Sequence, residues 1–385
     1  MANAANLVNF GTSGLNIGDW TYSLGPLNAP AYLPLNDATV LYLTSSYVTL
    51  AAVIDNPYYS FTTTAQSIGT NSGSYYSAVA SNGTTTVSVV YGTPGGAGLS
   101  AVSSTDLINW TFRTMPSAAY WSSVTYGGGT FVAVAQLTSA GSSSCTVAAT
   151  STNGTTWTSR TLPTATQWRC VIYGNSQFLA VAGPSTAAAT SPDGITWTAR
   201  TLPASRTWIA LAYGASLYVA VNSDTATNSY ATSPDGITWT TRTPPYALGT
   251  AGRSIAFANG TFVWATNSGT LYTSADGLTW TLRATPGSLQ FSDVSYGGGL
   301  FVVLGGGGAS TDNRAITSTD GKVWTLRTLP SSQNWQAITY TGSAFFATSQ
   351  DTNGVSMSAV VASTGQFTLP VVTPVTGTQT YVKAT

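Results

Sequence analysis

The sequence predicts an all-β protein, a single β-propeller of about eight, alternatively seven, four-stranded blades. Three observations predict this fold: one stretch recurs along the chain, each recurrence is accompanied by short runs of alternating apolar residues, and turn residues separate these runs. The two clearest copies begin at Ser191 and Ser233 and both read Ser-Pro-Asp-Gly-Ile-Thr-Trp. A period in the low forties with about four strands in each unit is typical of propeller blades.

Related copies of this stretch end at tryptophans that recur along the rest of the chain. These anchors are Trp110, Trp157, Trp197, Trp239, Trp280 and Trp324, with a decayed copy at 363–370. From residue 38 onward each unit reads as four short strands joined by Gly, Asn and Asp turns. The second strands of eight units lie near Tyr47, Thr86, Phe131, Phe178, Tyr218, Phe262, Phe301 and Phe345. The first unit lacks an Asp turn, so seven blades with an additional N-terminal unit remain an alternative.

The ends of the chain lie outside the clean repeats. Residues 1–37 are expected to form an N-terminal arm or a strand that closes the ring, and 18–26 resemble a drifted outermost strand. Residues 38–370 are expected to form the propeller, and 371–385 a C-terminal strand or tail. The N-terminal strand would pair with the last blade, or the segment would dock on a neighbouring subunit; the sequence leaves both open.

The repeated residues have structural causes. In each Asp turn the carboxylate accepts backbone N–H bonds and the Gly adopts the left-handed conformation. The Trp that follows is expected to pack between strands, and the Arg three residues later lies on the opposite face of its strand. These repeated charges therefore predict scaffold and no ligand site.

The pattern Ser/Thr-x-Asp-x-Gly-x-Thr-Trp is similar to the Asp-box, or BNR repeat, of sialidase-like β-propellers. Residues 191–197 and 233–239 show it in a compressed form, and the resemblance covers about residues 100–370. It implies a propeller fold, and with the composition below it suggests a non-enzymatic member of the kind found in phage virion or tail appendages. Such a fold by itself implies no particular activity.

Sialidase activity does not follow from the resemblance. That family uses a Tyr nucleophile polarised by a Glu, and this chain contains no Glu and no His. Without His, and with Cys145 and Cys170 as its two cysteines, the chain also lacks the usual ligands of zinc and the usual bases of Ser–His or Cys–His catalysis. We therefore expect no enzyme activity, no catalytic residues, no metal and no cofactor, and two free cysteines rather than a disulfide framework.

Two groups of residues form a candidate ligand-binding site. Aromatic residues recur near the start of the first strands, on the same face as the most variable loops: Trp121, Trp168, Trp208, Phe291 and Trp335. A ring of exposed aromatic side chains with polar loops is suited to sugars. The alternative is that these rings fill the wedges between blades. Arg169, Arg206 and Arg253 lie outside the repeated Arg position, and they are expected to form a cluster that binds carboxylates.

Composition suggests where the protein works. Charged residues make up 6% of the chain and the net charge is +0, so no field attracts nucleic acid or an anionic membrane. The N-terminus shows no secretory signal and no segment is apolar enough to insert into a membrane. A charge-poor surface suits a subunit packed in an assembly. We expect a structural and adhesive virion protein, a phage tail or head appendage, within an oligomer with other structural subunits, that binds a host surface glycan or protein. The alternatives are a bacterial extracellular surface or filament subunit and, disfavoured, a sialidase-like carbohydrate-active enzyme.

Overall fold

The computed structural model describes residues 75–92, 99–138, 142–225, 229–244, 251–306 and 311–350, together with strands at 22–23, 32–35, 40–42, 61–66, 357–362, 366–368 and 379–383. The chain forms two compact units. One comprises Met1–Ser60 with Ala362–Thr385, and the other Phe61–Val361. Boundaries at residues 60 and 361 differ from those at 37 and 370 that the repeat pattern suggested.

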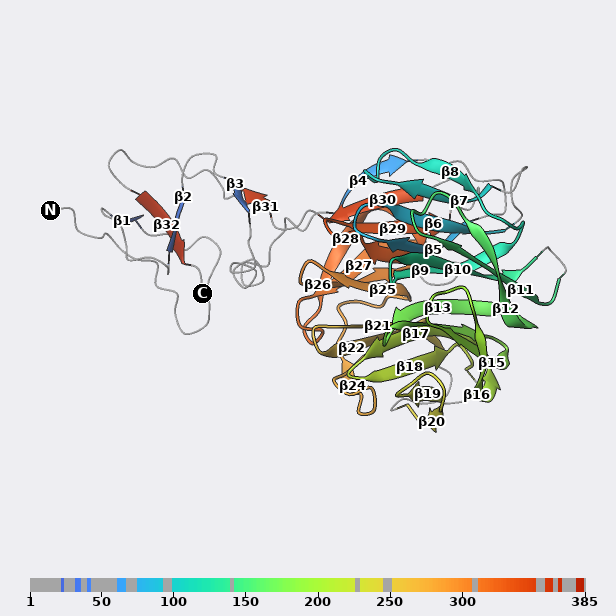
Figure 1. The fold of residues 1–385 in the computed structure, drawn as a ribbon. Helices are drawn as coiled ribbons and strands as arrows, with labels where there is room; N and C mark the ends of the chain where they lie inside the picture. The colour runs from blue at the N-terminus through green and yellow to red at the C-terminus, as the bar shows by residue number, and fades with distance from the viewer. Residues whose placement is uncertain are drawn as a thin grey trace. The chain divides into compact units, whose positions relative to one another are not determined.

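The larger unit is a β-propeller of antiparallel four-stranded sheets (Figure 1). In each sheet the strands follow chain order, as hairpins with Gly, Asn and Asp turns dictate. The first three sheets are β5 (Tyr75–Ser81), β6 (Thr86–Tyr91), β7 (Leu99–Ser104) and β8 (Thr111–Thr114); β9 (Tyr120–Gly127), β10 (Thr130–Leu137), β11 (Cys145–Ser151) and β12 (Thr158–Thr166); and β13 (Trp168–Gly174), β14 (Gln177–Ala182), β15 (Ser185–Ser191) and β16 (Thr198–Arg206).

Three further sheets continue the ring in chain order. They are β17 (Trp208–Gly214), β18 (Leu217–Asn222), β19 (Tyr230–Ser233) and β20 (Thr240–Arg242); β21 (Gly252–Ala258), β22 (Thr261–Thr266), β23 (Leu271–Ser274) and β24 (Thr281–Arg283); and β25 (Phe291–Gly297), β26 (Leu300–Gly305), β27 (Asp312–Ser318) and β28 (Thr325–Tyr340), to which β29 (Phe345–Gln350) adds a fifth strand. The described residues thus form six blades, and the prediction of eight or seven is corrected.

The correction has two physical reasons. Tyr47, around which the first unit was predicted, lies outside the described residues, and the nearby strand β3 (Val40–Tyr42) pairs with β31 (Gln366–Thr368) in the smaller unit. The unit predicted around Phe345 shares its first strand with the sixth blade, because the backbone runs without a break through the 16 residues of β28. Sequence periodicity counts hairpins and cannot show that two of them share one strand.

The ring of first strands is closed. The neighbours along it are β5, β9, β13, β17, β21 and β25, and then β28, which returns to β5. A two-stranded sheet of β4 (Phe61–Gln66) and β30 (Met357–Ala362) joins the two ends of this part of the chain. The smaller unit holds the remaining strands, in which β32 (Gln379–Lys383) pairs with both β1 (Tyr22–Ser23) and β2 (Tyr32–Leu35).

The core lies between adjacent blades. Second strands such as β10 and β14 are buried on both faces. Each consists mainly of small apolar residues and contains one aromatic residue, whose ring packs against the neighbouring sheet. Because each sheet contacts a sheet on either side, even alternating strands here read as almost continuous apolar runs. This packing fixes where the first strands lie around the central axis.

Candidate functional site

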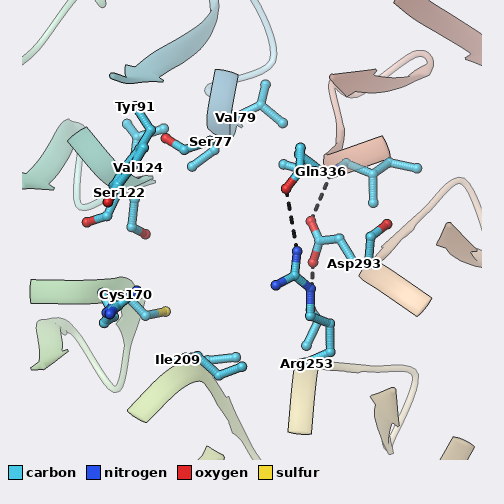
Figure 2. A pocket seen from close by; sticks show the side chains of 18 of the residues that line it. Ser77, Val79, Tyr91, Ser122, Val124, Cys170, Ile209, Arg253, Asp293 and Gln336 are labelled. Atoms are coloured by element: carbon cyan, nitrogen blue, oxygen red, sulfur yellow. Dashed lines mark hydrogen bonds between the residues drawn. The ribbon is translucent and has the colours of Figure 1, made fainter. Parts of the chain in front are cut away.

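A polar cavity of about 380 Å³ lies where the seven first strands converge (Figure 2). Its lining comes from the beginnings of these strands, together with Tyr91 of β6 and Gln136 of β10. Deeper residues of the strands, such as Val79, Val124 and Ile255, add apolar side chains to its lining. A concave site of this size is large enough for one small ligand or one sugar-sized group.

A β-bulge in each first strand shapes this cavity. The pairing with the second strand shifts at one place, directly after the residue at which the large inward-packing ring is expected. The extra residue lies unpaired, and bulges of this kind redirect a side chain. We call these seven positions the bulge ring: Ser77, Ser122, Arg169, Ile209, Arg253, Ser292 and Gln336. All seven line the cavity.

Two serines of the bulge ring form hydrogen bonds to the neighbouring blade. The hydroxyl of Ser77 donates to the carbonyl oxygen of Trp121 at 2.6 Å, and that of Ser122 donates to the carbonyl oxygen of Trp168 at 2.7 Å. These hydroxyls are therefore committed to the scaffold. Arg169 and Arg253 replace such a small side chain with a long cationic one, so the two blades that contain them change the chemistry of the cavity.

In some blades the residue after the bulge position makes a further hydrogen bond to the next blade. Ser123 accepts the backbone N–H of Val171 at 3.1 Å, and Asp293 accepts that of Ile338 at 2.9 Å. Asp293 also accepts the Ser254 hydroxyl at 2.6 Å and its neighbour's backbone N–H at 2.9 Å. Burial raises the pKa of Asp293, and these hydrogen bonds and the charge of Arg253 oppose that rise. Three donors leave this carboxylate little capacity to act on a ligand.

The two arginines give the cavity its positive charge. Arg169 donates through Nε to the carbonyl oxygen of Gly183 at 3.0 Å and through a terminal nitrogen to Gln167 at 3.0 Å. Burial lowers the pKa of Arg169, which stays protonated because an arginine starts so high. A terminal nitrogen of Arg253 lies 3.5 Å from Oε1 of Gln336 (Figure 2). The buried Nε of Arg253 has no hydrogen-bond partner among the described residues.

Two tyrosines complete the lining. The rings of Tyr75 and Tyr91 lie 5.2 Å apart at 32°, and Tyr120 meets Tyr91 edge-on at 5.2 Å. Burial raises the pKa of Tyr75, and both Arg169 and Arg253 act in the opposite direction. Tyr75 and both arginines line the same cavity. The cavity combines cationic donors, amides and aromatic rings in one place.

The predicted aromatic ring is buried instead of exposed. Trp121, Trp168, Trp208, Phe291 and Trp335 are each 0–1% exposed. Their rings pack in the clusters between blades, and the indole N–H groups of Trp168 and Trp208 donate to carbonyl oxygens of the preceding outer strand at 3.1 Å. A fully buried ring offers no face to a sugar. The expectation that these residues bind a ligand is therefore corrected to the alternative, packing of the wedges between blades.

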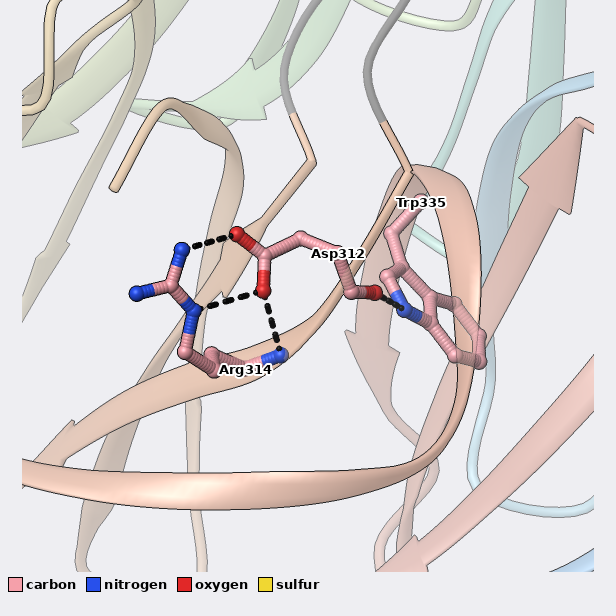
Figure 3. Close-up of polar contacts among 3 residues, drawn as sticks. All are labelled: Asp312, Arg314 and Trp335. Atoms are coloured by element: carbon pink, nitrogen blue, oxygen red, sulfur yellow. Dashed lines mark hydrogen bonds and ion pairs between the residues drawn. The ribbon is translucent and has the colours of Figure 1, made fainter. Parts of the chain in front are cut away.

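The predicted arginine cluster is divided. Arg169 and Arg253 line the cavity, whereas Arg206 ends the outer strand β16 and donates to the carbonyl oxygen of Ser205 at 3.0 Å. Arg314, the other arginine outside the repeated position, forms an ion pair of 2.7 Å with Asp312, whose carbonyl oxygen accepts the indole N–H of Trp335 (Figure 3). Sequence position alone does not distinguish the first strand from the end of the strand before it.

The bulge ring was missed by sequence reasoning, although a signal for it exists. Each of its members directly follows the same position of its strand. In most strands this position holds a buried ring, such as Trp168 before Arg169 and Trp208 before Ile209. Strict alternation would place the neighbour of a buried ring on the opposite face, and the bulge directs it into the cavity instead. Comparing the residue after each buried ring along the repeats would have singled out Arg169, whereas Arg253 follows Gly252 and has no ring before it to mark it.

The remaining features of the described part of the chain concern metal ions, membranes and thiols. No group of three or more His, Cys, Asp or Glu side chains there is placed to hold a metal ion. None of the described elements is a helix of the length and apolarity needed to cross a membrane. Cys145 and Cys170 are free thiols, and Cys170 lines the cavity, where burial raises its pKa to about 12.

Comparison with known proteins supports the propeller. Residues 116–248 and, in an overlapping second match, 204–292 fit the family described as "DUF6242 beta propeller domain". This part of the chain is similar to a DUF6242 propeller. The two matches together span fewer than half of the residues. No curated protein matches the chain.

Solved structures show the same fold at low sequence identity. The structure described as "YCF48 bound to D1 peptide" has a TM-score of 0.58 and 18% identity, covering 87% of this chain and 100% of its own. A catalytically inactive virginiamycin B lyase from Staphylococcus aureus with quinupristin has a TM-score of 0.63 and 11% identity, covering 78% and 100%. YCF48 from Cyanidioschyzon merolae has 0.55 and 17%, covering 77% and 98%. Identities this low show a shared fold alone.

Proposed function

We propose that the protein is a non-enzymatic binding module and that its ligand enters the central cavity. The observation that supports this most is the bulge ring, in which an identical backbone device repeats while its side chains differ from blade to blade. A scaffold needs the bulges and the serine hydrogen bonds between blades, but it has no need of two cationic side chains beside an aromatic pair. Side chains that break a structural repeat are suited to recognition.

The carboxylate inventory supports binding without catalysis. Asp293 is the one carboxylate among the described residues that line the cavity, and three hydrogen bonds already occupy it. Hydrolysis of a glycoside needs two convergent carboxylates. Two propellers of similar fold are described with a bound peptide and with quinupristin, so ligand binding is compatible with this architecture.

The setting we propose is the one the composition suggested. The propeller would belong to a virion appendage and present its cavity to a host surface, and a bacterial surface or filament subunit is the alternative. Low charge and apolar, Ser- and Thr-rich composition support a subunit that is packed into an assembly. In either setting the cavity is the part that meets the ligand.

Two matched substitutions test the location of binding. Ile209→Trp places a large ring in the bulge ring between the two arginine blades, whereas Ile195→Trp makes the same change at a side chain that is 48% exposed on an Asp turn. Each protein would be applied to a glycan array and a peptide array. We expect binding by the wild type and Ile195→Trp and none by Ile209→Trp. Loss only in Ile195→Trp, or no binding by the wild type, would contradict the proposal.

A further inference from the structure

Resting on the proposed binding function, we infer that the cavity recognises a cyclic monocarboxylate. Its carboxylate lies between Arg169 and Arg253, and its ring lies against Tyr75 and Tyr91. Four properties of the cavity support this ligand class: unpaired donors, net charge, an aromatic wall and size.

Unpaired donors point to an anion. The buried Nε–H of Arg253 has no hydrogen-bond partner among the described residues, and one terminal nitrogen of Arg169 is likewise outside the hydrogen bonds found for that side chain. A buried guanidinium donor without an acceptor is unfavourable, because it has lost its hydrogen bonds to water and gained none in the protein. A carboxylate accepts such donors in pairs, and charge-assisted bonds of this kind are among the stronger ones in proteins.

The charge balance selects a monoanion. Arg169 and Arg253 contribute two positive charges to the lining, and Asp293 contributes one negative charge when ionised. Burial raises the pKa of Asp293, while the three groups that donate to it and the charge of Arg253 favour its ionised form. With Asp293 ionised, the one net positive charge is neutralised by a carboxylate, whereas a phosphate monoester, with a charge of about −1.5 to −2 at pH 7, would leave an excess of negative charge in a partly buried site.

The aromatic wall selects a ring. The rings of Tyr75 and Tyr91 pack at a tilt of 32°, and Tyr120 packs edge-on against Tyr91, so the wall is fixed before a ligand arrives. Tyr75, Tyr91 and both arginines line the same cavity. A flat ring or the apolar face of a sugar packs well on such a surface while its carboxylate reaches the arginines.

The remaining lining limits the ligand to one ring. The cavity holds about 380 Å³, which is close to the lower end of small-molecule sites. Ile209 lies in the bulge ring between the two arginine positions and offers an apolar contact at the edge of the ligand. Gln136 and Gln336 offer amide groups for hydroxyls. Two chemical sources share this description, an acidic sugar and an aromatic carboxylic acid.

Direct titration with small probes tests the inference. The probes are glucuronate, benzoate, glucose and glucose 6-phosphate, added to the full chain and followed by calorimetry or ligand-observed NMR. We expect at least one of the two carboxylates to bind and to bind at least about tenfold more tightly than glucose and glucose 6-phosphate. Tighter glucuronate would identify an acidic sugar as the source, and tighter benzoate would identify an aromatic acid.

Matched arginine variants locate the contact. Arg253→Gln removes a cavity guanidinium, and Arg200→Gln removes one from the repeated position, where Nε bonds to Thr190 Oγ1 at 3.0 Å. Losing one charge-assisted bond typically weakens binding by a factor of about 10 to 100. We expect that loss in Arg253→Gln and in Arg169→Gln, and affinity within about twofold of wild type in Arg200→Gln, with circular dichroism showing all three folded.

The outcomes separate this inference from the proposed function. Affinity for both carboxylates no tighter than for glucose, or unchanged carboxylate affinity in both cavity variants, would overturn the cyclic monocarboxylate. If glucose or glucose 6-phosphate then binds and Ile209→Trp abolishes that binding, the cavity still serves as a binding site for another ligand class. If no probe binds to the wild type and array binding is unaffected by Ile209→Trp, both proposals fail.

Discussion

The Asp turns and the bulge ring are both repeated around the propeller, but they repeat different things. In the Asp turns the side chains themselves recur: Ser191 donates to Asp193 at 3.0 Å, and Asp193 accepts two backbone N–H groups at 2.8 and 3.0 Å. Equivalent bonds recur at Asp235, Asp276 and Asp320. In the bulge ring only the backbone irregularity recurs, and the side chain is free to change.

This difference distinguishes the arginines that belong to the scaffold from those that line the cavity. In six blades an arginine donates through Nε to a Ser or Thr hydroxyl of the neighbouring strand, as Arg200 does to Thr190. These cations therefore hold the outer edge of a blade together. Arg169 and Arg253 have the same chemistry, but they lie in the cavity, where no such strand hydroxyl takes their charge. Function is to be sought where the backbone repeats and the side chain does not.

The largest expected effect separates two adjacent residues of β13. Trp168 is buried and Arg169 lines the cavity, so Trp168→Ala should lower the free energy of unfolding by about 3–5 kcal/mol. Arg169→Ala should lower it by about 1 kcal/mol, because it loses bonds to Gly183 and Gln167 without leaving a core cavity. Urea denaturation measures both. A Trp168→Ala protein as stable as wild type would show that the anchor is not part of the core.

A smaller effect is expected at the Asp turns. Asp193→Ala removes an acceptor for two backbone N–H groups and should cost about 1 kcal/mol, since the turn is exposed and water competes for these donors. Asp193→Asn should be nearly neutral at pH 7, because Asn153 makes the same two bonds in the second blade. Thermal unfolding of the two variants checks this ranking. Equal loss in both would mean that charge, and not geometry, stabilises the turn.

The direction of pH dependence distinguishes the two regions most finely. Backbone N–H bonds lower the pKa of Asp193, so its stabilising contribution is present above the unfolded pKa of about 4 and is lost as pH falls through the folded value. Burial raises the pKa of Asp293, so the folded state holds that proton more tightly and its contribution is lost as pH rises through the folded value.

Asp293→Asn should therefore remove a fall in stability that the wild type shows as pH rises above about 4. Asp193→Asn should remove a fall that appears as pH decreases below about 4. Denaturation with urea at a series of pH values between 2 and 8 measures both slopes. The same sign of change in the two variants would contradict the contrast between an exposed turn carboxylate and an enclosed cavity carboxylate.

Much of the fold could be predicted because the geometry of a propeller blade produces local patterns in the sequence. The period of the anchors, the Asp turns and the small apolar second strands all reflect contacts within one blade or with the next. The blade count was wrong because it depends on long-range pairing. Whether β29 begins a new sheet or extends the sixth, and whether residues 40–42 join the ring, is decided by partners distant in sequence.

The candidate site was predicted in part and for a partly mistaken reason. Arg169 and Arg253 were singled out because they break the repeat, and both line the cavity. The aromatic ring was assigned to the surface because Trp168 and its equivalents recur near variable loops. Recurrence, however, is what core packing also produces. The tyrosines that do line the cavity, Tyr75 and Tyr91, stand on the first blade alone and left no periodic signal.

The sequence by itself determined the blade, because four short strands, a tight Asp turn and a wedge of aromatic rings are set by neighbours in the chain. Only the tertiary structure decided what the blades enclose. Closing the ring brings seven bulge positions from 77 to 336 around one axis, and the bulges direct into the cavity side chains that simple alternation would have placed elsewhere. The role of a charged side chain depends on the groups that face it across the ring. These groups come from residues distant in sequence, so no local pattern contains them.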